Sequence, residues 1–566
     1  MEESNAYKEL SKERKKLQKQ NRLPSWITTP SFQLLKEKYL DSHSPCLKST
    51  YWRIANCAAA HLPDQHTWAA RFFELMWRGW LAPSTPVLAN MGTNKGSPVS
   101  CSGSYIGDSI HDFYDNRTEG ALLSKEGFGT SGYLGDIRHR GSVISSGGKA
   151  DGVVPVFRGH RRMAQDVSQG QQRRGSWAGY LPIEHGDFYE LLTFINNNPD
   201  DSNIGWNISN DFIARVASGD SDATSRYEDA LLLKMVQGKG YFFFPDKVNA
   251  LNPPMYEEHN LNVKASNLCT EITLHSDEDH TFTCVLSSMN LARYDAWKDT
   301  DAVEYATVFL DCVAEEFIVR GREIRGLEKA VRFTERGRAL GLGTMGFHTY
   351  LQSKGIALDS LEAAGINSQI FKDIRGKADV ATKKMAQDLG EPDWCRGFGV
   401  RNTHVMAIAP NLSSALVCGG VSQGIEPVYE NVYEQSTPAG NINRVNPVLL
   451  KLMRKKDVYN DKTLNSILED NGSVYRQDWL SEDEKGVFKT FFEWDQHALV
   501  RLAAQRQRYI DQAQSLNLAF AADADEEYIS SVHQEAFTNP FIKSLYYIRS
   551  KAGVRGSTGE CTVCEG

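Results

Sequence analysis

Long hydrophobic runs are missing from this sequence, and cysteine is scarce. No stretch of about 18 consecutive apolar residues is present, so no membrane-spanning helix is predicted. The N-terminal residues MEESNAYKELSKERKKLQKQ are charged rather than apolar, which argues against a secretory signal peptide. Ten cysteines scattered over 566 residues do not form the dense framework of a small secreted domain. We therefore predict a cytoplasmic chain, in which paired cysteines are more often catalytic or metal-bound.

An excess of basic charge is also lacking. The net charge is -8, the pI is about 6.0 and 41% of the residues are hydrophobic. This composition is typical of a globular protein without general affinity for nucleic acids or anionic membranes. Segment 8–22 carries seven Lys or Arg with little apolar periodicity. We interpret it as a solvated, partly helical arm rather than a nucleic-acid or membrane site.

Hydrophobic periodicity predicts alternating helices and strands. Apolar residues at helical spacing predict helices over 66–81, 301–324 and 484–514. Short apolar runs predict buried strands at GYFFFPD (240–246) and VMAIAP (405–410). This alternation favours the α/β class.

Three regions are expected along the chain. Residues 1–82 form the charged arm and a helical region. Residues 83–549 form one large domain, because no internal repeat or long low-complexity linker divides them. Residues 550–566 have the composition of a flexible linker, with four glycines and no apolar periodicity.

Two cysteines, Cys561 and Cys564, lie within the last six residues, in STGECTVCEG. Chain ends are weakly anchored, so this pair is poorly placed to staple a fold. A zinc knuckle would need two further ligands, and the nearest other histidine or cysteine is His533. The pattern favours a dithiol carried on a flexible arm.

The best candidate for a reactive centre is SNLCTEITL. Asn267, Cys269 and Glu271 alternate with apolar or small residues, so an extended backbone would point amide, thiol and carboxylate to one side. Together they could surround a small polar substrate. The alternative is an inert buried cysteine on an edge strand.

Two more cysteines lie in polar, Ser-rich surroundings: Cys101 in SPVSCSGSYIGDSI and Cys284 in TFTCVLSSMNLARY. With these segments the sequence resembles the large subunit of ribonucleotide reductase. The resemblance runs from PSTPVLANMGT at Pro83 to the last residue, with the motifs in the family's order. It implies a ten-stranded α/β barrel of two half-barrels, with the Cys269 loop inserted through the centre and helices around the outside.

The resemblance also implies the roles of the reacting groups. Cys269 is similar to the thiyl-radical cysteine that removes the 3′ hydrogen of the ribose. Glu271 would take the proton of the 3′-hydroxyl, and Asn267 would hold the ribose. Cys101 and Cys284 would deliver two electrons and a proton as the 2′-hydroxyl leaves as water, and would end as a disulfide.

That disulfide would lie deep in the barrel, and thiol exchange requires contact between sulfur atoms. The resemblance therefore gives the tail cysteines Cys561 and Cys564 the role of a shuttle. They would reduce the internal disulfide and then be reduced by a thioredoxin- or glutaredoxin-type protein.

Tyr546 and Tyr547, in SLYYIRS, resemble the tyrosine pair that relays oxidation in class I enzymes. The radical would come from a separate, metal-containing small subunit, and no cofactor or metal would be bound in this chain. RQRYIDQAQSLNL (506–518) also resembles the family. The alternative is a class II enzyme, which uses adenosylcobalamin and does not need the pair. The glycyl-radical motif of class III is not seen.

Substrate phosphates need backbone N–H groups and hydroxyls. The segment APNLSSALVCGG corresponds to the family's diphosphate-binding turn, and Thr85 and Ser100 would complete the pocket. The implied substrate is a ribonucleoside 5′-diphosphate. The residues assigned to the turn are Pro410, Asn411, Leu412, Ser413 and Ser414.

The family also binds a dNTP or ATP effector at a homodimer interface, and the resemblance implies a dimer promoted by the effector. The loop SQGQQRRGS is similar to the loop that informs the active site, but no proline follows its arginines, so which arginine contacts the base stays open. The residues implied for the effector site are Asp108, Ser109, Ile110 and Arg138, and those of the loop are Gln169, Arg173 and Arg174.

Fewer than ninety residues precede STPVLAN, and they lack the signature of the N-terminal ATP-binding module of many relatives. We therefore expect no shut-off by dATP at such a site.

Two other function classes fit parts of the sequence. GLGTMG (341–346) fits the G-x-G-x-x-G pattern and Asp359 lies where a ribose-binding acid could, which would suit a dinucleotide-dependent dehydrogenase. However, TERGRAL precedes it where a hydrophobic strand should be. A non-enzymatic redox sensor would explain the tail but leaves Asn267, Cys269 and Glu271 without a purpose.

Overall fold

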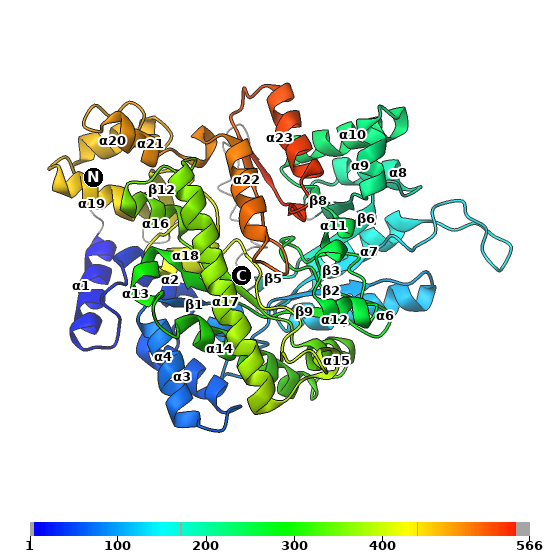
Figure 1. Cartoon of the computed structure of the whole chain (residues 1–566), viewed down its shortest axis with the longest axis horizontal. Helices are drawn as coiled ribbons and strands as arrows, with labels where there is room; N and C mark the ends of the chain where they lie inside the picture. The colour runs from blue at the N-terminus through cyan, green and yellow to red at the C-terminus, as the bar shows by residue number, and fades with distance from the viewer. Residues whose placement is uncertain (1–4, 170–172, 201, 438–439, 551–566) are drawn as a thin grey trace.

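The computed structural model describes residues 5–169, 173–200, 202–437 and 440–550. Its N-terminal part is helical, as drawn in blue in Figure 1: α1 (Asn5–Lys19), α2 (Thr29–Lys38), α3 (Leu47–Ala59) and α4 (Gln65–Trp77). The helix predicted over 66–81 is present but ends earlier, at Trp77. Gly79 adopts a positive φ of 66°, a conformation that glycine tolerates, and the chain then enters a strand.

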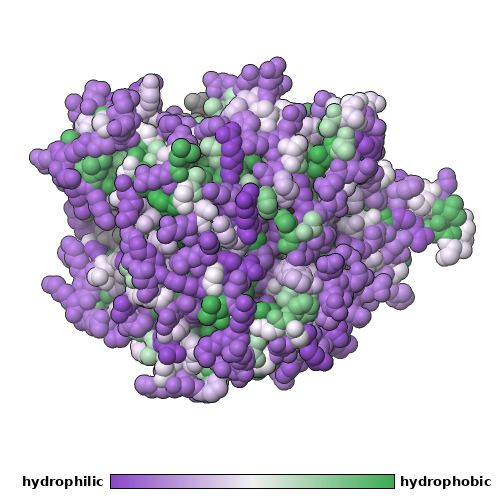
Figure 2. Space-filling model, viewed as in Figure 1, coloured by the Kyte–Doolittle hydropathy of each residue, from purple (hydrophilic) through white to green (hydrophobic). Residues whose placement is uncertain are grey.

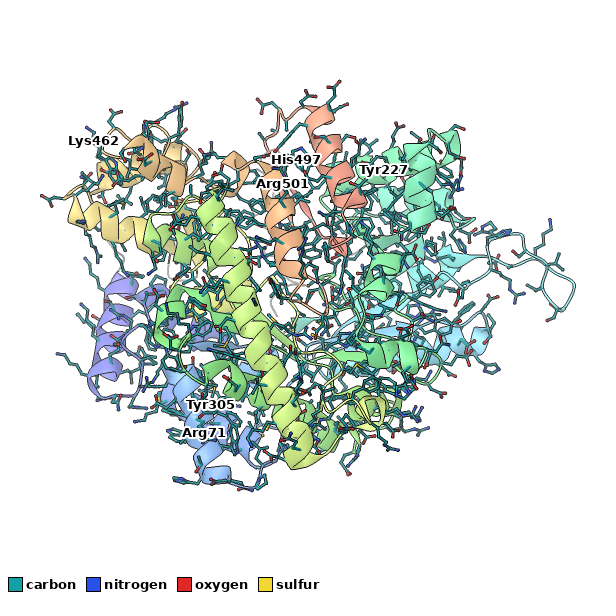
Figure 3. The ribbon with its side chains drawn as sticks, viewed as in Figure 1. Arg71, Tyr227, Tyr305, Lys462, His497 and Arg501 are labelled. Carbon is teal, nitrogen blue, oxygen red and sulfur yellow. The ribbon has the colours of Figure 1, made fainter. Side chains whose placement is uncertain are left out.

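Helices α3 and α4 pack against α14 (Ala302–Gly321). Arg71 of α4 and Tyr305 of α14 lie side by side (Figure 3), with the guanidinium carbon 4.8 Å from the ring centroid. The helix predicted over 301–324 is thereby confirmed as α14. This contact joins the N-terminal helices to the rest of the molecule.

A seven-stranded sheet forms the first part of the barrel. Its order is β15-β8-β7-β6-β3-β2-β9. The five central strands run parallel, whereas β9 and β15 pair antiparallel at the two edges. The strand GYFFFPD is confirmed as β8. The bounds are β2 (Cys101–Tyr105), β3 (Gly129–Tyr133), β6 (Trp177–Pro182), β7 (Asn203–Asn207), β8 (Tyr241–Phe243), β9 (Phe282–Cys284) and β15 (Ser544–Leu545).

The second half-barrel continues from β9 after the single residue Val285. Strand β10 (Leu286–Asn290) pairs parallel with β11 (Gly341–Met345) and antiparallel with β1 (Leu81–Pro83). Segment 405–410 is buried and extended but forms only isolated bridges, from Met406 to Leu342 and from Ile408 to Gln514.

Hydrogen bonds close the ring. The backbone N–H of Tyr546, just after β15, donates to Leu516 O over 2.8 Å. Among the described residues, if the three-residue strand β1 is left out and the β9–β10 pair counts as one strand and each bridged segment as one, the ring has ten members in two half-barrels of five. This arrangement agrees with the predicted α/β barrel.

Helices cover the outside of the ring, and the long helix α17 crosses the front of the molecule in Figure 1. The remaining helices of eight or more residues are α6 (Ile110–Lys125), α7 (Val153–Asp166), α8 (Phe188–Asn197), α9 (Asn210–Ala217), α10 (Ser221–Gln237), α15 (Glu328–Gly337), α16 (Phe347–Lys354), α17 (Leu361–Leu389), α19 (Pro447–Lys455), α20 (Asp461–Glu469), α22 (Gln496–Gln507) and α23 (Glu526–Thr538).

The shorter elements join these parts. The short helices are α5 (Thr85–Asn90), α11 (Pro245–Ala250), α12 (Pro254–Glu258), α13 (Tyr294–Trp297), α18 (Leu412–Val417) and α21 (Glu482–Val487), with 3-10 turns η1 (Leu291–Arg293), η2 (Asp393–Cys395) and η3 (Phe491–Glu493). The remaining strands form three pairs: β4 (Ser168–Gln169) with β5 (Arg173–Arg174), β12 (Val432–Thr437) with β13 (Gly440–Val445), and β14 (Leu518–Phe520) with β16 (Ile548–Ser550).

The single long helix predicted over 484–514 is wrong. The segment contains the end of α21, the turn η3 and helix α22. Two local caps interrupt it: the Thr490 side chain and Glu493 form a capping box, and Asp495 accepts a hydrogen bond from His497 N at the start of α22. Side chains that cap a new helix end compete with continuation of the previous one.

The visible surface in Figure 2 is mainly hydrophilic, with hydrophobic residues in small separate groups. None of the helices in the described parts of the chain is long and apolar enough to cross a membrane.

Candidate active site

The segment SNLCTEITL forms a turn inside the barrel, not the extended strand that was predicted. Thr270 has a positive φ of 66°, and its N–H points back to Asn267 O at 3.4 Å. The Asn267 side chain accepts a hydrogen bond from Ile272 N over 3.2 Å. Asn267, Cys269 and Glu271 therefore come together because the chain turns, and the Asn267 side chain closes that turn. The alternation of side chains along an extended strand does not describe this arrangement.

Side chains from distant elements fix this turn. Ser515 Oγ lies 2.6 Å from Cys269 O and 3.1 Å from Glu271 Oε2, and the Tyr180 hydroxyl donates to Asn267 O over 2.6 Å. Neither Ser515 nor Tyr180 is predicted from the sequence to have a role. The only available signal was that Ser515 lies within RQRYIDQAQSLNL, a segment that resembles the family.

Glu271 is almost completely buried, with 1% of its surface exposed. Burial, together with the nearby Cys101 sulfur, raises the pKa of its carboxyl group to about 8. Next to it, the amide nitrogen Nδ2 of Asn267 is buried without a hydrogen-bond partner among the described residues. An unpaired buried donor is costly, and a polar substrate held at the turn would satisfy it.

Cys101 and Cys284 lie opposite each other on neighbouring antiparallel strands, β2 and β9. Both are reduced and buried, and directly opposed residues of such a pair are close enough for their side chains to meet. Burial and the neighbouring Cys101 raise the pKa of the Cys284 thiol well above its ordinary value. The two cysteines are therefore adjacent, and the Cys284 thiol is protonated at neutral pH.

Three tyrosines connect this centre to the end of the described chain. Tyr546 donates its hydroxyl to Cys269 Sγ over 3.5 Å, and its ring centroid lies 4.0 Å from that of Tyr547. Tyr241 of β8 contacts both rings, and its hydroxyl lies 3.5 Å from that of Tyr547. The sequence predicts roles for Tyr546 and Tyr547 but not for Tyr241, because GYFFFPD has the pattern of an ordinary buried strand.

The turn 410–414 lies at the edge of the second half-barrel. Asn411 adopts a positive φ of 56° directly before α18, and its amide donates to Ser288 Oγ and to Thr344 O. Ser414 Oγ contacts a backbone carbonyl of β1 at 3.4 Å. The side chains of Asn411 and Ser414 are thus both used within the protein, which leaves the backbone N–H groups at the start of α18 for a ligand.

The other two residues predicted for this pocket come from the strand ends. Thr85 opens α5 immediately after β1, and its Oγ1 lies 3.1 Å from the Tyr39 hydroxyl. Ser100 directly precedes Cys101 and is 2% exposed. Within the described ranges, the buried hydroxyls of Ser84 and Thr344 have no hydrogen-bond partner.

The residues predicted to bind an effector line a separate cavity of about 1280 Å³, into which α6 and α7 both project side chains. Asp108 and Arg138 form an ion pair there, Arg138 Nε to Asp108 Oδ2 at 2.5 Å. Ser109 caps α6 by accepting from Asp112 N, and Ile110 is 69% exposed. The cavity contains none of the five residues assigned to the reacting groups.

The loop predicted to inform the active site begins and ends as a short hairpin, in which Gln169 pairs with Arg173 and Ser168 with Arg174. Residues 170–172 lie outside the described residues, as do Cys561 and Cys564. Gln169, Arg173 and Arg174 are therefore placed by their backbone alone.

The dehydrogenase pattern GLGTMG does not form a phosphate-binding turn. Most of it is the buried strand β11, and a Cβ on Gly343 would lie 2.8 Å from Ala407 O. The glycines permit close packing within the barrel, so this alternative has no structural support.

One group of ligand-type atoms lies beyond the catalytic turn. His275, Asp277 and His280 hold atoms within 4.8 Å of one another. Asp277 lies 2.8 Å from each histidine, and Arg336 Nη1 lies 3.1 Å from His280 Nε2. The positive charge of the Arg336 guanidinium would repel a metal cation at this position. The three side chains are hydrogen-bonded to one another, so we interpret the group as a structural network.

Comparisons with known proteins agree with this geometry. The model described as "Ribonucleotide reductase, barrel domain" matches residues 99–225, 221–398 and 392–548, and "Ribonucleotide reductase, all-alpha domain" matches residues 26–96. The chain is 34% identical to a putative ribonucleoside-diphosphate reductase large subunit of Frog virus 3, over 95% of this chain and 99% of the relative. It is 30% identical to the large subunit of Invertebrate iridescent virus 3, over 94% and 97%.

Among solved structures, the chain is similar to the class Id ribonucleotide reductase alpha subunit of Actinobacillus ureae. The TM-score is 0.86 and the sequence identity 38%, over 93% of this chain and 98% of that one.

Proposed function

The chain belongs to the ribonucleotide reductase large-subunit family, and from this premise we propose which residues perform its reaction. It is a ribonucleoside-diphosphate reductase large subunit of class I. The adenosylcobalamin-dependent alternative is not supported by the comparisons. In class I the radical comes from a separate small subunit, whose metal supplies the oxidising equivalent.

In the proposed reaction, the Cys269 thiyl radical removes the 3′ hydrogen of the ribose. Glu271, as carboxylate, accepts the 3′-hydroxyl proton, and Asn267 donates its unpaired amide to the sugar. The 2′-hydroxyl leaves as water after taking a proton from the Cys101 and Cys284 pair. The other thiol of the pair supplies the hydrogen that C2′ gains, so the two sulfur atoms give up two electrons in all and become a disulfide. Glu271 returns its proton to O3′, and Cys269 returns the hydrogen to C3′ and is again a thiyl radical. In sum, ribonucleotide and dithiol give deoxyribonucleotide, disulfide and water.

The observation that carries this proposal is the contact between Tyr546 and Cys269. A phenol placed 3.5 Å from a buried thiol has the geometry for transferring a hydrogen atom. Tyr547 extends the path, because its ring lies tilted against that of Tyr546 with the centroids 4.0 Å apart. No packing requirement explains why a thiol, a carboxyl and an unpaired amide share one turn with this phenol.

The remaining assignments complete the proposal. Residues 410–414, Thr85 and Ser100 bind the diphosphate. The cavity with Asp108 and Arg138 binds a dNTP or ATP effector, and the hairpin with Gln169, Arg173 and Arg174 passes its identity to the active site of an effector-promoted homodimer. Cys561 and Cys564 re-reduce the internal disulfide, with a thioredoxin- or glutaredoxin-type protein as external reductant. A cytoplasmic location fits this thiol chemistry.

The decisive experiment is reduction of CDP to dCDP by the purified chain with dithiothreitol and an effector. Parallel reactions contain a metal-loaded small subunit from the same source, adenosylcobalamin, or neither. We expect turnover only with the small subunit, and none for Cys269→Ser, while Cys312→Ser, a buried cysteine of α14, retains activity. Turnover of Cys269→Ser would overturn the assignment.

A further inference from the structure

The second tyrosine of the proposed relay lies against an arginine. Arg549 belongs to β16, two residues after Tyr547, so both side chains leave the same face of the extended segment. The guanidinium carbon lies 4.8 Å from the Tyr547 ring centroid. This is the geometry of a cation–π contact, and it places a permanent positive charge beside a phenol.

A buried carboxylate, Glu426, attracts the Arg549 guanidinium. Glu426 is 5% exposed and accepts a hydrogen bond from the Tyr429 hydroxyl over 2.7 Å. Both the Tyr429 phenol and the Glu426 carboxylate attract the Arg549 guanidinium electrostatically. Burial alone would lower the pKa of Arg549, but the Coulomb attraction of Tyr429 and Glu426 outweighs it, so that the net direction is upward.

The same carboxylate also holds the backbone of the tyrosine. Asn517 donates its amide to Glu426 Oε1 and accepts the Tyr547 N–H at 2.9 Å. Asn517 therefore links the Tyr547 backbone to Glu426, and the Tyr547 ring lies against the Arg549 guanidinium, which Glu426 attracts. A side chain fixed from both sides has little freedom to change its orientation.

We propose that Arg549 is a positioning residue that holds the Tyr547 ring and biases the radical toward Tyr546. This inference rests on the relay proposed above. A cation over a ring stabilises the electron-rich phenol more than the electron-poorer phenoxyl radical, because the attraction depends on the π electrons of the ring. The guanidinium lies over the ring of Tyr547, whereas the Tyr546 hydroxyl contacts Cys269. The phenoxyl radical is therefore favoured on Tyr546 over Tyr547.

The step is balanced without an additional reactant. The Tyr547 phenoxyl radical gains one electron and one proton and becomes a phenol. Tyr546 loses one electron and one proton and becomes the phenoxyl radical. The initial oxidation of Tyr547 is supplied by the metal-containing small subunit.

The test replaces Tyr547 with 2,3,5-trifluorotyrosine, whose ionisation is followed by absorbance in the complete chain without the small subunit. Removing a neighbouring cation disfavours the phenolate, so Arg549→Gln should raise the phenol pKa by about one pH unit or more. Arg549→Lys, which keeps the charge, should raise it less. Arg549→Met serves if the glutamine variant does not fold, with the same rise expected.

The matched control is Arg508→Gln. Arg508 lies at the same 4.8 Å distance over the ring of Phe541, so its loss should leave the fluorotyrosine pKa unchanged. With the natural tyrosine and the small subunit, Arg549→Gln should lower kcat about tenfold with KM for CDP unchanged, because one pH unit of bias corresponds to a factor of ten.

Two failures can be told apart. If Tyr547→Phe retains turnover with the small subunit, the relay itself is wrong. If Tyr547→Phe is inactive but Arg549→Gln changes neither the fluorotyrosine pKa nor kcat, the relay stands and the role given to Arg549 is overturned.

Discussion

The hydroxyl of Tyr546 donates a hydrogen bond to the sulfur of Cys269 over 3.5 Å. The two residues are 277 positions apart, and they meet because the segment after β15 closes the barrel ring beside the central turn. Tyr546 is 1% and Cys269 5% exposed. A hydrogen atom can therefore pass between them while water is kept out, which a thiyl radical requires to survive.

Replacing Tyr546 by phenylalanine should abolish CDP reduction, because the ring packing is kept while the transferable hydrogen is lost. Residual dCDP formation should fall at least about a thousandfold, the scale of losing an essential chemical group. The control is Tyr227→Phe, which changes a buried tyrosine of α10 that packs against Phe537 of α23 (Figure 3). Both variants should show unchanged circular dichroism, and full activity of Tyr546→Phe would contradict the relay.

Without an external reductant, the number of dCDP molecules formed per chain should not exceed the number of dithiol pairs that take part in the reaction. The pre-reduced chain with its small subunit should form at most two dCDP per chain, one from Cys101 and Cys284 and one after exchange with the tail pair. A Cys561→Ser, Cys564→Ser variant should form at most one. Mass spectrometry of that spent variant should find Cys101 joined to Cys284, and another cysteine pairing would refute the assignment.

The residues that we propose to react were selected from the sequence, but their arrangement was only partly predicted. Asn267, Cys269 and Glu271 were selected from an alternating pattern, yet they meet because Thr270 adopts a positive φ and Asn267 closes the turn. Local periodicity cannot report that conformation, since threonine rarely adopts it and the surrounding barrel enforces it.

The residues that contact this turn and the tyrosine pair could not be predicted from the sequence, for a different reason. Ser515 contacts Glu271 from 244 positions away, and Tyr241 contacts Tyr547 from 306 positions away. The order of the strands in the barrel determines which distant residues meet. The pattern of apolar residues within a single segment does not contain that information. In contrast, α14 and β8 were predicted correctly because their buried faces follow from local apolar spacing.

Arg138→Ala should weaken binding of a dNTP effector at least about tenfold, because the variant loses a cation able to pair with its phosphates. Arg140→Ala is the matched control: Arg140 is exposed, pairs with Glu190 at 2.7 Å and does not line the cavity. Equilibrium dialysis with labelled dTTP measures both. Equal affinities of the two variants would mean that the cavity is not the effector site.

Asp311→Asn should lower the free energy of unfolding by about 3–5 kcal/mol, the usual cost of removing one partner from a buried ion pair. Asp311 of α14 is 2% exposed and accepts from Arg338 at 2.8 Å and Arg401 at 2.9 Å. Despite burial, these two arginines lower the pKa of Asp311 to about 2. Urea denaturation followed by tryptophan fluorescence would measure the loss, and a change below about 1 kcal/mol would contradict it.

The pH dependence of turnover should show the ionisation of the Glu271 carboxyl group. Burial and the adjacent Cys101 raise its pKa to about 8, so in the free enzyme at pH 7 most molecules carry the protonated form, which cannot accept the 3′-hydroxyl proton. The value of kcat/KM should therefore increase about tenfold per unit from pH 6 toward pH 8 and level off above it.

Glu271→Gln should abolish turnover, since the amide cannot accept the proton. The matched control is Glu119→Gln on α6, because burial raises the pKa of that carboxyl group to about 7, yet it lies outside the catalytic turn. This variant should keep the wild-type profile. If the inflection moves with Glu119→Gln, or if kcat/KM is flat between pH 6 and pH 9, proton transfer to Glu271 does not limit the reaction.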